Sequence, residues 1–112
     1  MYFLGLDIGS SSVKAALVEA KSGKSIQSVH EPKNEMSISS LKNDWAEQDP
    51  NVWWKYTCTA IKRVCKESNI DPKKIISIGI SYQMHGLVIV DKNGEPLRDS
   101  IIWCDSLSLI HI

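Results

Sequence analysis

The segment Leu4-Gly5-Leu6-Asp7-Ile8-Gly9-Ser10-Ser11-Ser12-Val13-Lys14-Ala15-Ala16-Leu17-Val18 decides how the rest of the chain is interpreted. Residues 2–6 form a short apolar run that ends at Asp7, which is typical of a buried strand. Residues 13–18 form a second apolar run with few polar side chains. The segment therefore predicts a β-hairpin that turns at Gly9 and the three serines after it.

The composition of this turn is suited to binding an anion. Gly9 tolerates backbone angles that a Cβ would forbid, so the N–H groups of the turn can point together. The hydroxyls of Ser10, Ser11 and Ser12 add donors without adding charge. Asp7 is badly placed to bind a phosphate but well placed to hold Mg²⁺, which takes one or two carboxylates and keeps most of its waters.

A lone D-x-G-S would most often be an ordinary hairpin, but its surroundings favour a functional role. The spacing D-x-G-x-x-x-x-K, which runs from Asp7 to Lys14, resembles the first phosphate loop of the actin-like ATPase superfamily. Neither a Walker loop nor a Rossmann G-x-G-x-x-G is present. The predicted cofactor-binding residues are Asp7, Gly9, Ser10, Ser11, Ser12 and Lys14.

Length and charge bound the class of protein. The 112 residues suffice for one core domain, and 13 basic residues balance 13 acidic ones, so we expect neither nucleic acid nor membrane as a partner. No apolar run reaches a membrane span, and the N-terminus lacks the basic flank of a signal peptide. The chain has an odd number of cysteines, namely Cys58, Cys65 and Cys104, and no C-x-x-C spacing. This pattern predicts reduced thiols in a cytoplasmic protein.

The middle of the chain predicts a third strand, a loop and a helix. Residues 25–30 alternate weakly as a strand of a meander, and residues 31–43 are expected to form an irregular loop or a short edge piece. Asp49 before Pro50 is a helix-start signature, and the helix should run to about Ser68, with Asn69 and Pro72 ending it. The side chains expected to face a sheet are Trp53, Trp54, Cys58, Ala60, Ile61, Val64 and Cys65, and those expected opposite are Lys55, Lys62 and Lys66.

The last third predicts further strands. Residues 74–81 have the length and β-branched content of a central strand, and residues 86–91 predict another. Asn93-Gly94 lies in a predicted hairpin turn over residues 92–96, and residues 100–104 predict a final strand. The expected fold class is mixed α/β around one sheet.

Between two of these strands lies the polar cluster Tyr82-Gln83-Met84-His85-Gly86. Loops at sheet ends often carry function. Taken alone, His85 would more often be a structural histidine and Met84 a core residue.

Four motifs together resemble the N-terminal part of the FGGY-type carbohydrate kinases, most closely the xylulokinases among them. They are D-I-G-S-S-S-V-K at residues 7–14, W-A-E-Q-D-P at 45–50, Q-M-H-G at 83–86 and L-R-D-S-I-I-W-C-D at 97–105. They fall in family order and cover the chain from Tyr2 to about Ser106.

The resemblance implies an actin-like ATPase (ribonuclease H-like) fold and ATP-dependent phosphoryl transfer to a ketose hydroxyl, with ATP and Mg as cofactors. Asp7 would position magnesium, the turn after it would approach the phosphates, and Met84 and His85 would line the sugar pocket. Q-M-H-G favours D-xylulose over glycerol. A homodimer is an expectation for the full-length protein.

The resemblance also implies missing parts. The general base, an Asp, and the adenine pocket belong to later segments of the family. Residues 107–112 depart from the family pattern, so we expect residues 1–106 to be a partial N-terminal domain, and 107–112 a tail left by truncation or a frameshift. Such a fragment should be inactive alone.

Two other readings remain open. The chain could be an actin-like nucleotide-binding switch or chaperone-type module with no small-molecule substrate, or a small stand-alone binding domain. The Met84-His85 pair argues against the first, since such modules have no reason to place it in the cleft.

Overall fold

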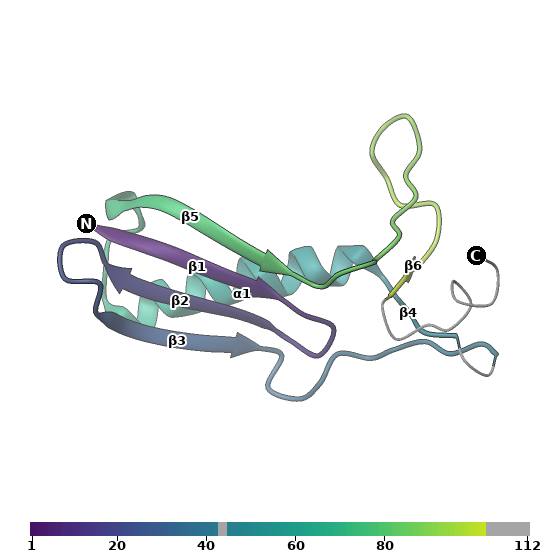
Figure 1. The fold of residues 1–112 in the computed structure, drawn as a ribbon, viewed down its shortest axis with the longest axis horizontal. Coiled ribbons are helices and arrows are strands. Elements are labelled where there is room, and N and C mark those ends of the chain that lie inside the picture. The colour runs from purple at the N-terminus through teal and green to yellow at the C-terminus, as the bar shows by residue number, and fades with distance from the viewer. Residues whose placement is uncertain (43–44, 103–112) are drawn as a thin grey trace.

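The computed structural model describes residues 1–42 and 45–102, and it contains a four-stranded mixed sheet with one long helix against it (Figure 1). The strands β1 (Tyr2–Ile8), β2 (Val13–Glu19) and β3 (Ser25–Glu31) form an antiparallel meander. The strand β5 (Ile75–Tyr82) lies parallel to β1 on its other side, giving the order β3-β2-β1-β5. The predicted hairpin and third strand are confirmed.

Alternation along the hairpin sets the two faces of the sheet. Leu4 and Leu6 of β1 and Val13, Ala15 and Leu17 of β2 are buried. Because successive side chains of a strand point to opposite faces, these five residues share the face that α1 covers. Phe3, Gly5 and Asp7 therefore lie on the opposite, open face.

The helix α1 (Pro50–Ser68) begins and ends where the sequence predicts. The Asp49 side chain accepts a hydrogen bond from the Asn51 N–H at 2.9 Å, and Pro50 occupies the first turn. Asn69 closes the helix in the left-handed conformation, with φ of 53°. The 3₁₀ helix η1 (Pro72–Lys74) then leads into β5.

The predicted buried arc of α1 is confirmed in its centre and at Trp53, which packs partly buried against the core, and is wrong at Trp54. Ala60, Val64 and Cys65 are buried, the three lysines are exposed, and Thr57 joins the buried face. Trp54, however, is 69% exposed. The helix packs mainly on β2 and β3 and little on β1, so the arc that the sheet covers is narrower than the pattern predicts. Figure 1 shows the first turns of α1 extending beyond the arrowhead of β5.

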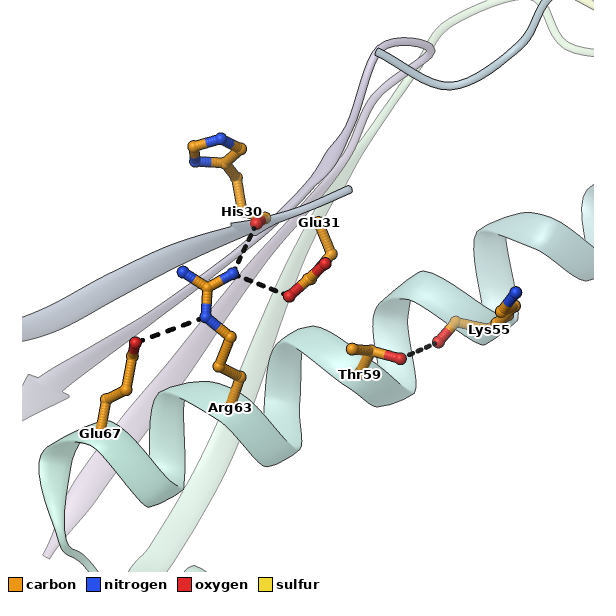
Figure 2. A network of polar contacts seen from close by, with 6 residues as sticks. All are labelled: His30, Glu31, Lys55, Thr59, Arg63 and Glu67. Carbon is orange, nitrogen blue, oxygen red and sulfur yellow. Dashed lines mark hydrogen bonds and ion pairs between the residues drawn. The ribbon is translucent and has the colours of Figure 1, made fainter. Parts of the chain in front are cut away.

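Arg63 connects the middle of α1 to the end of β3 (Figure 2). Its guanidinium donates to the Glu31 carboxylate at 2.7 Å, to the His30 carbonyl at 3.1 Å and to the Glu67 carboxylate at 3.4 Å. The hydrogen bond with Glu31 is the main cause that raises the pKa of Arg63. The network therefore connects the C-terminal end of β3 to the middle of α1.

One late prediction of strand structure is wrong. Residues 86–91 form no strand, because only Leu87 and Val90 make isolated bridges, to Ile101 and Pro96. Val88 and Ile89 are each 42% exposed, so this segment has little packing that would hold it extended beside another strand. The predicted turn at Asn93-Gly94 is present, with Gly94 at φ of 82°.

A small second sheet contains the first two residues of the predicted last strand, which is confirmed over them. It pairs β4 (Glu47–Gln48), within a motif that carried no strand prediction, with β6 (Ser100–Ile101). The remainder of the predicted strand at 103–104, and the predicted tail at 107–112, lie outside the described residues.

The strand β5 is an edge strand of the described sheet, not a central one, and most of its residues are exposed. Its predicted range of 74–81 is otherwise confirmed within one residue. Among the described residues, no helix is long and apolar enough to cross a membrane.

Candidate functional site

The turn between β1 and β2 is tightly closed. Gly9 N–H donates to the Ser12 carbonyl at 3.0 Å, and a Cβ at Gly9 would lie 3.2 Å from that same oxygen. The positive-φ glycines are Gly23 and Gly94, so the expected reason for glycine at position 9, an unusual backbone angle, is wrong. Glycine suits this position because a Cβ would be in tight contact with the backbone of the same turn.

Asp7 and Lys14 stand beside this turn. They are direct cross-strand partners in the β1–β2 register, and both are exposed on the open face of the sheet. Ser81 of β5 neighbours Asp7 on its other side. A single exposed carboxylate fits Mg²⁺, which keeps most of its waters, and the described residues hold no cluster of three or more ligating side chains.

The predicted sugar loop begins directly next to the turn. The Gln83 N–H donates to the Ile8 carbonyl at 3.1 Å, which extends the parallel β1–β5 pairing by one bond. Met84 and His85 follow at once, and Met84 is 67% exposed. Because β1 and β5 are parallel, their carboxyl ends bring the Gly9 turn and the Met84-His85 pair to one edge of the sheet.

His85 has a left-handed backbone, with φ of 61°. This region is uncommon for residues other than glycine, although histidine enters it more readily than most. The side chain is exposed, so it is free of the core and available to a ligand. The role of His85 in binding sugar stays a prediction.

The small β4–β6 sheet supports Leu87, which directly follows the predicted sugar-binding segment 83–86. Leu87 exchanges two backbone hydrogen bonds with Ile101, and the Ser100 hydroxyl donates to the Leu87 carbonyl at 2.7 Å. Glu47, buried in β4, forms an ion pair with Arg98. Sequence reasoning missed the Glu47–Arg98 pair, although opposite charges in W-A-E-Q-D-P and L-R-D-S were a usable signal.

Two hollows are lined in part by residues 32–35. One, of about 430 Å³, is lined by Ser11, Ser12 and Lys14 together with His30 and residues 32–35. A larger one, of about 610 Å³, lies between residues 32–39 and the start of α1 and includes none of the predicted site residues. Of the predicted cofactor-binding residues, Ser11, Ser12 and Lys14 line one of these two hollows, and Asp7, Gly9 and Ser10 line neither.

The comparisons with known proteins identify the family. Residues 2–109 match the N-terminal domain of the FGGY family of carbohydrate kinases. The chain belongs to this family. Curated relatives include a xylulose kinase from Staphylococcus epidermidis, 39% identical over 96% of this chain and 21% of its own length. The xylulose kinase from Bacillus subtilis is 35% identical over 94% of this chain and 20% of its own length.

Solved structures of the same family share the fold. A xylulose kinase from Brucella ovis superposes with a TM-score of 0.87 at 35% identity, over 96% of this chain and 22% of its own. A ligand-bound xylulose kinase from Lactobacillus acidophilus gives 0.82 at 29% identity, over 98% and 21%. The FGGY segment therefore has the actin-like ATPase fold, as an incomplete piece that spans about a fifth of the curated relatives it matches.

Proposed function

We propose that this FGGY segment is the N-terminal part of a phosphotransferase that moves the γ-phosphoryl group of ATP to a ketose hydroxyl, D-xylulose being the favoured acceptor. The observation that carries the proposal is that the Gly9 turn and the Met84-His85 pair lie next to each other, at the carboxyl ends of β1 and β5. The Gln83–Ile8 hydrogen bond joins the two segments. Membership of a carbohydrate kinase family and the xylulose kinase relatives support the choice of acceptor.

In the proposed reaction, the acceptor hydroxyl oxygen forms a bond to the γ-phosphorus while the bond to the β,γ-bridging oxygen breaks. ADP leaves, and the hydroxyl proton passes to a general base, which we place in the part of the kinase beyond this segment. Phosphoryl transfer needs alignment and neutralisation of charge more than covalent help.

Each residue of the segment has a role in this proposal. The N–H groups and hydroxyls of Ser10, Ser11 and Ser12 bind phosphate oxygens, and Lys14 adds a positive charge on the same face as Asp7. The Asp7 carboxylate would hold Mg²⁺, which would supply neutralisation of the phosphate charge. His85 exchanges a hydrogen bond with a sugar hydroxyl.

A hybrid kinase tests the proposal. In it, the matched residues of this chain replace the corresponding 107 residues of the Staphylococcus epidermidis xylulose kinase. We expect the hybrid to consume ATP in a D-xylulose-dependent manner, and the 112-residue chain alone to show no turnover. A folded hybrid that binds neither MgADP nor D-xylulose would contradict the proposal.

A further inference from the structure

Three successive carbonyls of the Gly9 turn are held from three different directions. The Ser12 carbonyl accepts from Gly9 N–H at 3.0 Å, and the Ser11 carbonyl accepts from Met36 N–H at 2.8 Å. The Ser10 carbonyl accepts from the Gln48 side-chain amide at 2.5 Å. Two of these bonds come from backbone, which any residue can supply. The third depends on the identity of residue 48.

These bonds orient the N–H groups of the turn. Among the described residues only the Glu31–Pro32 peptide bond is cis, so the peptide groups of the turn are trans. In a trans peptide the carbonyl of one residue points opposite to the N–H of the next. Fixing the Ser10 and Ser11 carbonyls toward the protein therefore directs the N–H groups of Ser11 and Ser12 away from it.

Gln48 is itself held in one orientation. The residue is 3% exposed, and its Oε1 accepts from the Trp53 indole N–H at 2.9 Å. An indole N–H can only donate and a carbonyl can only accept, so Trp53 and Ser10 together determine which end of the amide carries oxygen. Trp53 lies in the first turns of α1, so the chain of bonds runs from the helix start to the phosphate turn.

We propose that Gln48 is a positioning residue for the nucleotide: it holds the turn so that the Ser11 and Ser12 N–H groups face the phosphates, and Trp53 holds Gln48. This inference rests on the proposed function. Gln48 touches neither substrate. Its amide also donates to the Ser37 carbonyl at 3.5 Å, but it reaches the turn through the Ser10 carbonyl. The neighbouring residue Glu47 is equally buried but pairs with Arg98, which makes it a matched control.

Three substitutions separate the relay from general packing. Gln48→Met keeps the side-chain volume and removes its three side-chain hydrogen bonds, with the Ser10 carbonyl, the Ser37 carbonyl and the Trp53 indole. Trp53→Phe keeps an aromatic ring, removes the indole N–H and makes the side chain smaller. Glu47→Gln changes the adjacent buried side chain without touching the turn.

The first measurement is amide hydrogen exchange of residues 9–13, in the 112-residue chain and in the hybrid kinase, without nucleotide. We expect Gln48→Met to speed exchange in this segment about tenfold, and Glu47→Gln to leave it unchanged. Exchange that rises equally in β1, β2 and α1 would mean general destabilisation and would overturn the proposal.

The second measurement is calorimetric binding of MgADP and of D-xylulose to the hybrid kinase. Gln48→Met should weaken MgADP about tenfold and leave D-xylulose unchanged, while Trp53→Phe should weaken MgADP by a smaller factor. The double variant should bind MgADP no more weakly than Gln48→Met alone, because both substitutions break one chain of bonds.

The outcomes distinguish this inference from the function on which it rests. Unchanged MgADP affinity in Gln48→Met, or fully additive effects in the double variant, would overturn the positioning role. Failure of the unsubstituted hybrid to bind MgADP would overturn the proposed function instead, and would remove the nucleotide from the role of Gln48.

Discussion

Asp7 is the residue whose proposed role depends most on charge alone. It follows a buried strand and precedes the tight turn at Gly9, with its carboxylate on the open face beside Lys14. Replacing it with Asn keeps its shape and removes the charge. We expect Asp7→Asn in the hybrid kinase to lower kcat about 100-fold, because part of the metal-assisted stabilisation of the transferred group is lost.

The binding of D-xylulose provides the control for Asp7→Asn. Asp7 does not face the sugar on this proposal, so the dissociation constant of D-xylulose should stay within about twofold. A near-normal kcat would reduce Asp7 to a hairpin residue. Joint loss of sugar binding and thermal stability would make its role structural.

His85 combines a proposed sugar contact with a left-handed backbone. We expect His85→Ala in the hybrid to weaken D-xylulose binding by about 1–3 kcal/mol, the cost of stranding a hydrogen-bond partner, and to leave MgADP affinity unchanged. Alanine is strained at positive φ, so His85→Gly is the matched variant that removes the side chain without strain. If calorimetry gave normal sugar affinity for His85→Gly, the backbone and not the imidazole would be responsible.

Cys65 makes stability depend on pH. Its thiol is 5% exposed, and burial raises its pKa above the ordinary value of 9.0. Above that value the unfolded chain loses its proton while the folded chain keeps it, so this contribution is complete below about pH 9 and is lost as the pH rises through the folded pKa.

Denaturant unfolding of the 112-residue chain between pH 7.5 and 10 measures the effect, as differences of at most about 1.4 kcal/mol per pH unit for one group. Cys65→Ala should flatten the alkaline loss of stability. Cys58→Ala, on the same helix but partly exposed, should not. Equal slopes in the two variants would refute the assignment.

At the scale of elements, the Arg63 network is the polar connection between α1 and β3 that Figure 2 displays. Glu31, with 16% of its side chain exposed, would lose its partner in Arg63→Met. We therefore expect a lower melting temperature for Arg63→Met than for Lys62→Met, whose lysine is exposed. Scanning calorimetry measures the melting temperatures of both variants. Equal values would show that the network does not stabilise the packing of α1 on β3.

Elements with strong local signals were predictable from the sequence. The hairpin, the Asp49-Pro50 helix start and β5 each carry their own periodicity or capping chemistry. The two-residue strands β4 and β6 were not predictable, because they depend on pairing between residues about 50 positions apart. The same reason hid the Gln48–Ser10 contact, whose partners are 38 residues apart.

The predicted site follows the same division. The sequence identified the Gly9 turn and the Met84-His85 pair separately, and the parallel pairing of β1 with β5 brings them to one edge. Residue roles at that edge stay predictions. What local pattern could not supply was the support behind it, in which Glu47 and Arg98 pair across the small sheet.

At the scale of the whole molecule, the sheet is only half covered. Leu4 and Leu6 of β1 are buried beneath α1, but their direct partners on β5, Ile78 and Ile80, are 54% and 59% exposed. Paired residues of neighbouring strands point to the same face, so the covered face continues past the helix as an exposed apolar surface. Ile76, on the same side of β5, is 52% exposed and extends it.

This surface gives the last prediction. The 112-residue chain should bind an apolar fluorescent dye and associate at micromolar concentration, because contiguous exposed apolar surface is a site of association. Replacing Ile78 and Ile80 together with threonine keeps the β-propensity of the strand and should reduce both properties severalfold. Ile26→Thr is the matched control, since Ile26 is 40% exposed on β3, at the far edge of the sheet. We therefore expect dye binding and sedimentation to show less dye bound and less association for the double variant than for the unsubstituted chain or Ile26→Thr. Equal association of all three would mean that the β5 face is not the surface through which the chain associates.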